Sequence, residues 1–289
     1  MKTLIKISLI TFISLNTLHA KEINTETLDH KVISFSKNIL NKYKNSGLNV
    51  ERVEILSKAK VSNNEEYQAY IMGFDLALKN GAKTKTERLT DIFFVGKSGV
   101  ISTQLFSIDG KNLKDETIFN VKDNYYNKEH LLLGKLEYKN KIIIFSDYSC
   151  PFCQDTIEKM KKIYKNKEVG IYLVDYPLTK IHPAAPIIAA IAKQATRKGL
   201  KITPFDLYEN RKVRKLTKET DSRKIIEKIK GVFSIEIDEK ELFEIDMLDV
   251  NRDIKLSERV GVSKTPTLLL NGKRVKATTR LDNIITKYN

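Results

Sequence analysis

The chain has little of several residues on which common functions depend. It has no tryptophan, and its 51 lysine and arginine residues are spread along 289 positions rather than gathered in one cluster. A platform for stacking nucleic-acid bases needs aromatic side chains within a basic groove. The net charge of +15 therefore indicates a solvated, lysine-rich surface, and no nucleic-acid partner is expected. Beyond the first 20 residues, no run approaches the roughly 18 apolar residues of a membrane-spanning helix.

Cysteine is scarce as well, because Cys150 and Cys153 are the only two. A structural zinc ion needs four ligands, usually two such pairs or added histidines at short spacing. The histidines beyond residue 20 are scattered, at His30, His130 and His182. A structural disulfide closing so small a loop would constrain little of the unfolded chain. A redox-active dithiol is therefore the favoured interpretation.

Residues 1–20, MKTLIKISLITFISLNTLHA, place Lys2 and Lys6 around the start of an apolar run that ends at the small residue Ala20. This pattern predicts a secretory signal peptide, cleaved after about Ala20. The alternative is an uncleaved amphipathic anchor. Export would place the dithiol in a compartment that permits disulfide chemistry.

The rest of the chain is longer than one typical domain and divides near residue 130. Residues 24–45 have the apolar spacing of a helix. Strand-like runs follow, separated by turn signals, at 50–56, 66–78, 91–96 and 99–108. We therefore predict an α+β module over residues 21–110. Gly73 suggests a bulge or a close backbone approach, and the polar stretch 111–130 is expected to be a linker.

The dithiol follows a short apolar run, KIIIFS at 141–146, which predicts a buried strand. The residues after Cys153 have helical spacing, with Ile157, Met160, Ile163 and Tyr164 on one face. Pro151 suits the first turn of that helix. Because helix N-terminal amides stabilise a thiolate, we expect the pKa of Cys150 to lie below the ordinary value of about 8.5. Cys150 is then the attacking thiolate, and the shielded Cys153 is the resolving thiol.

A second motif lies far along the chain, at residues 258–275. Thr265-Pro266 precedes the strand-like TLLL, and Asn271-Gly272 predicts a hairpin turn with KRVKA as its return strand. Pro266 opens a strand that looks buried, a place where proline needs a special role.

Between the two motifs, residues 169–178 predict another buried strand. Helices are expected after Pro186, over 219–230 and over 238–258. His182, at the entry to the first of them, is expected to be a helix-entry or surface residue.

Together the two motifs resemble the thioredoxin fold. The run from Phe145 to Cys150, FSDYSC, is similar to the F-[ST]-D-x-[ST]-C run of periplasmic Dsb proteins of the DsbC/DsbG type. The motif-level resemblance covers about 141–178 and 254–276. It implies a thioredoxin-like domain at 131–289, with a helical subdomain inserted at about 183–252. It also implies a cis Pro266 beside the thiols, Thr265 offering its backbone to a client chain, and an N-terminal module that pairs two subunits.

Two departures limit what this resemblance implies. Pro151-Phe152 differs from the dipeptides usual in the family's isomerases, so oxidation, isomerisation and reduction all stay open. Ile144 stands where some thioredoxin-like proteins have a buried carboxylate, six residues before the first cysteine. Asp147 is nearer, but a solvated turn or cap residue is favoured there over a proton-transfer group.

The sequence therefore predicts a periplasmic thiol:disulfide oxidoreductase, in which an α+β module is joined to an α/β thioredoxin-like domain. Its catalytic residues are Cys150 and Cys153, with Thr265 and Pro266 binding substrate. The supporting residues are Pro151, Phe152 and Asp147. No metal or organic cofactor is expected. The expected partners are cysteine-containing clients, a membrane-bound redox partner that resets the dithiol, and a second copy of the chain. The alternative is a peptide-binding chaperone in which the dithiol is incidental.

Overall fold

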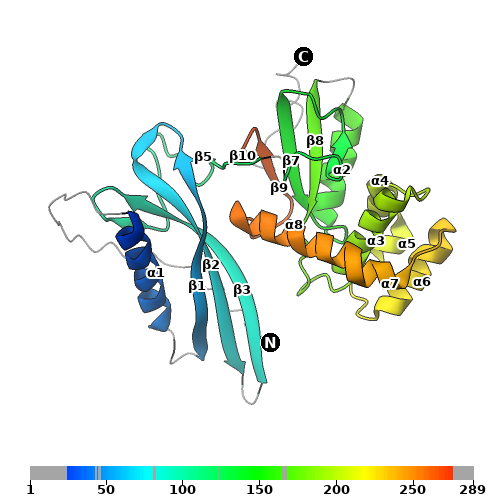
Figure 1. Cartoon of the computed structure of the whole chain (residues 1–289), viewed down its shortest axis with the longest axis horizontal. Coiled ribbons are helices and arrows are strands. Elements are labelled where there is room, and N and C mark those ends of the chain that lie inside the picture. Colours follow the sequence, from blue (N-terminus) through cyan, green and yellow to red (C-terminus); the bar gives the residue numbers. More distant parts are fainter. Residues whose placement is uncertain are drawn as a thin grey trace. The chain divides into compact units, whose positions relative to one another are not determined.

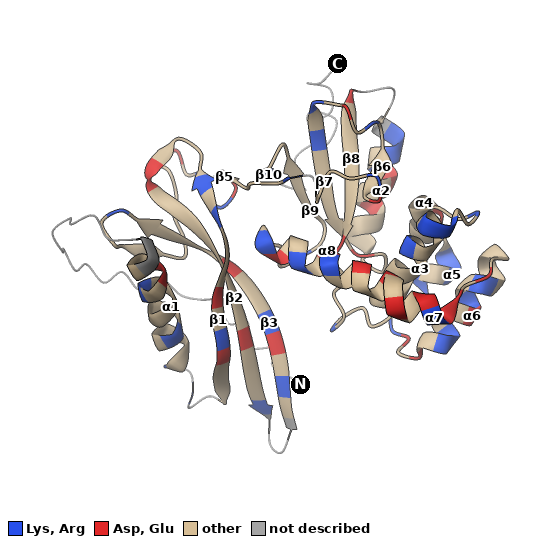
Figure 2. Ribbon diagram, viewed as in Figure 1, with Lys and Arg blue, Asp and Glu red and all other residues tan. Residues whose placement is uncertain are grey.

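The computed structural model describes residues 25–275, apart from 43, 45, 46, 81, 82, 123 and 165–167. The chain forms two compact units that divide between Phe119 and Asn120 (Figure 1). The predicted signal peptide, residues 1–20, lies outside the described residues. Lysine and arginine are interspersed with acidic residues along β1 to β3 and along α8 (Figure 2).

In the first unit, one helix packs against an antiparallel sheet. The helix is α1 (Thr25–Asn41), and the sheet order is β4 (Ile101–Ser102), β3 (Lys83–Gly96), β2 (Asn64–Asn80), β1 (Leu48–Val61) and β5 (Thr117–Ile118). The predicted helix and the first three predicted strands are confirmed. The apolar residues of α1 and of strands β1 to β3 pack into one core, which includes Val32, Leu40, Val53, Tyr70, Met72 and Phe93.

The fourth predicted strand, 99–108, is wrong for most of its length. Only Ile101–Ser102 joins the sheet. Gly99 adopts a positive φ of 85°, the Ser102 hydroxyl bonds the carbonyl of Gln104, and a turn closes from Ser107 to Gly110. These local hydrogen bonds compete with strand pairing.

Gly73 is not a bulge, because it pairs in register with Glu54 on β1 and Thr90 on β3. A Cβ at Gly73 would lie 2.5 Å from Nη2 of Arg88. The close approach at this glycine is therefore made by a side chain, whereas the sequence suggested a backbone.

The stretch 111–130, predicted as a linker, is divided between the two units. Its first part contributes β5, which pairs with β1 at Lys60 and Val61. Its second part belongs to the other unit, where Tyr125 and His130 are buried. The Tyr125 hydroxyl donates to the carbonyl of Leu256 at 2.9 Å. The polar composition of this stretch did not predict that Tyr125 and His130 are buried in the second unit.

The second unit is built on a mixed sheet covered by helices. Its order is β10 (Lys273–Val275), β9 (Thr267–Leu270), β7 (Asn140–Ser146), β8 (Val169–Asp175) and β6 (Leu131–Leu133). β7 and β8 run parallel, joined by α2 (Pro151–Ile163), because parallel neighbours need a crossover connection. The other pairs are antiparallel. The Asn271-Gly272 turn between β9 and β10 has positive φ at both residues, as predicted for a two-residue hairpin.

All the remaining described helices lie between β8 and β9 (Figure 1). They are α3 (Ala185–Lys198), α4 (Pro204–Glu209), α5 (Arg211–Arg214), α6 (Ser222–Phe233), α7 (Glu239–Glu241), the π-helical turn η2 (Leu242–Asp246) and α8 (Met247–Arg259). α3 begins one residue before Pro186 rather than after it. The apolar faces of these helices join the core of the sheet, through residues that include Ile188, Ile191, Tyr208, Ile226, Leu242 and Val250.

Candidate active site

Cys150 is the N-cap residue of α2, as the sequence predicts, and three residues separate it from the end of the buried strand β7 at Ser146. Its backbone N–H donates to the carbonyl of Asp147 at 3.0 Å, which closes the turn between strand and helix. Pro151 occupies the first turn of the helix, where its missing N–H costs no hydrogen bond. Cys153 follows one turn later and is fully buried, whereas Cys150 retains a small exposed area. Both are free thiols in this structure.

The two thiols differ in acidity. A hydrogen bond from the Cys153 thiol, helped by the backbone N–H groups of Cys153 and Phe152, lowers the pKa of Cys150 to about 6. Burial raises the pKa of Cys153 well above its ordinary value, and the neighbouring Cys150 adds to that rise. At neutral pH the arrangement therefore favours a thiolate on Cys150 and a protonated Cys153.

Thr265 and Pro266 lie beside the thiols although more than a hundred residues separate them in sequence. β9 pairs with β7, with Thr267 opposite Phe145, which brings the end of the preceding loop to the start of α2. The Thr265–Pro266 peptide bond is cis, as predicted. The Cys150 thiol donates to the carbonyl oxygen of Thr265 at 3.7 Å.

Phe152 is the second variable residue of the dithiol motif, and it faces solvent. Its side chain is 70% exposed, between two cysteines that are both buried. An exposed phenylalanine next to the more accessible sulfur gives this end of α2 an apolar surface.

Asp147 and His182 form a buried pair. Asp147 lies in a turn and His182 at the entry to α3, as predicted, but the expectation that Asp147 is solvated is wrong, and His182 does not lie on the surface. Oδ2 of Asp147 lies 2.8 Å from Nδ1 of His182 and accepts the N–H of Leu178 at 2.8 Å, while Oδ1 accepts the N–H of Ser149 at 2.7 Å. The two residues meet because β7 and β8 are parallel, so the segments following each strand leave at the same edge of the sheet. In the sequence, each residue follows a predicted buried strand, at 141–146 and at 169–178, so their proximity could have been predicted.

A second group of buried charges was missed by sequence reasoning. Asp253 on α8 lies 2.8 Å from Nε2 of His130 and 2.6 Å from Nζ of Lys193, and Asp175 at the end of β8 lies 3.4 Å from the same Lys193 Nζ. Burial raises the pKa of Asp175 to about 6, although Lys193 opposes the rise. No short sequence motif joins these residues, since they come from four separate segments.

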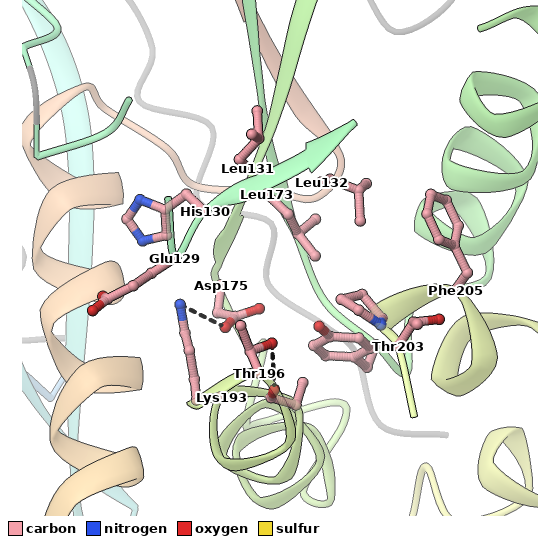
Figure 3. A pocket seen from close by; sticks show the side chains of 13 residues that line it. Glu129, His130, Leu131, Leu132, Leu173, Asp175, Lys193, Thr196, Thr203 and Phe205 are labelled. Atoms are coloured by element: carbon pink, nitrogen blue, oxygen red, sulfur yellow. Dashed lines mark hydrogen bonds and ion pairs between the residues drawn. The ribbon is translucent and has the colours of Figure 1, made fainter. Parts of the chain in front are cut away.

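His130, Asp175 and Lys193 border a pocket with a cavity volume of about 170 Å³, which is lined by β6, β8, α3 and the start of α4 (Figure 3). Its lining residues include His130, Leu131, Tyr148, Asp175, Lys193 and Phe205. The described residues contain no group of three or more His, Cys, Asp or Glu side chains placed to hold a metal ion. Nor does any helix in the described part of the chain have the length and apolarity needed to cross a membrane.

Comparison with known proteins places this site in a family. The model of a family described as thioredoxin matches residues 126–286, more than half of the chain. A search of the curated proteins found no match.

Solved structures were also compared. A thioredoxin-like oxidoreductase from Silicibacter pomeroyi DSS-3 shows 15% identity and a TM-score of 0.45, covering 58% of this chain and 94% of that one. Oxidised BdbD from Bacillus subtilis shows 19% identity and a TM-score of 0.41, covering 55% and 92%. The thiol-disulfide exchange protein alpha-DsbA2 from Wolbachia pipientis shows 19% identity and a TM-score of 0.43, covering 57% and 88%.

Proposed function

Because the chain belongs to the thioredoxin family, we propose that it is an exported thiol:disulfide oxidoreductase that forms, isomerises or reduces disulfides in other proteins. The observation that carries this proposal is the pairing of Cys150, whose pKa is lowered to about 6 at the start of α2, with a buried Cys153 one helical turn away. A thiolate at neutral pH is the reactive species in disulfide exchange.

The reaction begins at Cys150. Its thiolate attacks one sulfur of a client disulfide, so that a mixed disulfide forms and the other client sulfur leaves as a thiolate. Cys153 then loses its proton and attacks the Cys150 sulfur, forming the Cys150–Cys153 disulfide and releasing the second client sulfur. The client gains two electrons and the protein loses two. The reverse sequence oxidises a client. Isomerisation occurs when a different cysteine of the client attacks the client sulfur of the first mixed disulfide, which forms a new client disulfide and releases Cys150 as a thiolate.

The client chain is held by the segment before β9. The carbonyl oxygen of Thr265, 3.7 Å from the Cys150 sulfur, marks the position at which an extended peptide would run past the thiols. Backbone hydrogen bonding to Thr265 would add the client as a short strand, with Pro266 against the sulfurs. The exposed Phe152 would meet apolar side chains near the client cysteine. Asp147 supports the turn that carries Cys150.

The first unit is proposed to pair two copies of the chain. The last strand of its sheet, β4, covers β3 only at Phe94 and Val95 within the described residues. An incompletely covered strand edge offers a route to pairing with a second copy, and two-fold dimers are the commonest oligomers. In the proposed setting, the periplasm, a membrane-bound redox partner would reset the dithiol.

The proposal is tested by catalysis on a disulfide-containing client. Purified protein is expected to accelerate the reduction of insulin or the oxidative refolding of a reduced client, and Cys150→Ser is expected to abolish that acceleration. The competing chaperone function predicts that Cys150→Ser keeps full anti-aggregation activity and that the wild type shows no thiol-dependent activity. That second pattern would refute the oxidoreductase.

A further inference from the structure

The client loop, residues 260–266, joins the end of α8 to β9 and contains the cis peptide bond. Its end is fixed by β9, which pairs with β7 and places Thr267 opposite Phe145. The Thr267 hydroxyl also donates to the carbonyl of Lys264 at 2.7 Å. The start of the loop needs a separate anchor, because the last carbonyls of a helix have no partner within the helix.

Arg274 on β10 supplies that anchor. Its Nη2 donates to the carbonyl oxygens of Val260 and Gly261, at 3.0 Å each. Gly261 has a positive φ of 66°, the conformation in which glycine commonly ends a helix. The helix dipole also favours a cation beside these carbonyls. Arg274 therefore holds the point at which the client loop leaves the helix.

These contacts close a ring in the chain. The client loop continues into β9, the Asn271-Gly272 turn and β10, and the guanidinium of Arg274 returns to Val260, fourteen positions earlier. Arg274 itself is opposite Leu269 of β9 in the register of the hairpin. Its backbone thus belongs to the sheet that contains β7, the strand before the dithiol. Both ends of the client loop are tied to that sheet, one through β9 and the other through Arg274.

The carbonyl of Thr265 lies within this constrained segment, 3.7 Å from the Cys150 sulfur. Ser263 and Lys264, just before it, are exposed, so packing gives this part of the loop little support. A peptide that pairs with Thr265 through backbone hydrogen bonds needs the carbonyl at a defined distance and angle. A displacement of about 1 Å can slow a positioned reaction by about 10²-fold. The anchor at the start of the loop is therefore expected to affect peptide substrates.

We propose that Arg274 is a positioning residue for disulfide exchange, which holds the client loop so that Thr265 meets the client backbone beside Cys150. This inference rests on the proposed function. Arg274 acts through the carbonyls of the loop, and the exchange itself stays between the two cysteines and the client sulfurs. Its effect should therefore depend on whether the disulfide substrate has a peptide backbone.

The experiment compares two disulfides that react with Cys150 of the reduced protein. One is a peptide with a single disulfide, which can pair with Thr265, and the other is hydroxyethyl disulfide, which has no amide group. Arg274→Met removes the guanidinium and keeps an apolar stem. It is expected to slow the reaction with the peptide by about tenfold, the scale of a misplaced backbone hydrogen bond. The reaction with hydroxyethyl disulfide should be unchanged. Arg274→Lys should regain part of the peptide rate, because one ammonium group can donate to both carbonyls.

Arg252→Met is the matched control, because it removes an exposed arginine of α8 that pairs with Asp249. It should react with both disulfides at the wild-type rates, and chemical denaturation checks that each variant is folded. Unchanged rates in Arg274→Met, or an equal loss with both disulfides, would overturn the positioning role. If Arg274→Met fails to fold, Arg274→Lys decides: a lower ratio of peptide rate to hydroxyethyl disulfide rate supports the role, and a wild-type ratio overturns it. A wild type that reacts with neither disulfide would instead refute the proposed function.

Discussion

The imidazole Nδ1 of His182 lies 2.8 Å from Oδ2 of Asp147, and the same oxygen accepts the N–H of Leu178. Through its other oxygen, Asp147 also holds the N–H of Ser149, immediately before Cys150. One carboxylate thus ties the active-site turn to the segment that leaves β8 and enters α3.

His182→Ala is expected to destabilise the protein by about 2 kcal/mol or more, because it leaves the buried Asp147 carboxylate without its side-chain partner. Chemical denaturation of the oxidised protein measures this. His30→Ala is the control, since His30 is exposed on α1 and should change stability by no more than about 0.5 kcal/mol. Equal stabilities for the two variants would show that the pair does not hold the turn.

Cys150 is expected to titrate near pH 6, which ultraviolet absorbance of the thiolate measures directly. The folded-state pKa lies below the unfolded value of about 8.5, so the unfolded chain binds more protons between these two values. The free energy of unfolding of the reduced protein should therefore rise with pH from about 6 to about 8.5, and this stabilisation is lost as the pH falls through about 6. Cys150→Ser should lack this rise. A thiol that titrates at or above the ordinary value would contradict the assignment.

The full chain is expected to be a homodimer, held by the first unit. Light scattering on the chain without residues 1–20 measures this at micromolar concentration. A fragment beginning at Asn120, where the second unit starts, should be monomeric. A monomeric full chain would contradict the dimer, and a dimeric fragment would place the interface in the other unit.

The position of the dithiol followed from local sequence signals. A short apolar run, Pro151 and both cysteines all lie within residues 141–153, so strand, turn and helix start could be predicted together. The approach of Thr265 to Cys150 was implied by the resemblance and depends on the pairing of β9 with β7. Local periodicity does not specify that pairing.

Burial of polar residues was the part that sequence reasoning missed. Asp147, like His182, is an ordinary turn residue by type, and only the parallel register of β7 and β8 brings the two together away from water. Asp175 and Asp253 lie 78 residues apart, and a backbone N–H of one donates to the other across the core. Such contacts are set by how the inserted helices pack on the sheet, which no spacing of residues along the chain reveals.

The central claim is that Cys150 attacks and Cys153 resolves, and the most direct test is to trap the mixed disulfide. Cys153→Ser and Cys150→Ser are each incubated with a peptide that contains one disulfide, and the adducts are mapped by mass spectrometry. The account predicts that Cys153→Ser accumulates a stable adduct on Cys150, whereas Cys150→Ser forms none, because Cys153 is buried and its pKa is raised. An adduct on Cys153, or none on Cys150, would contradict it.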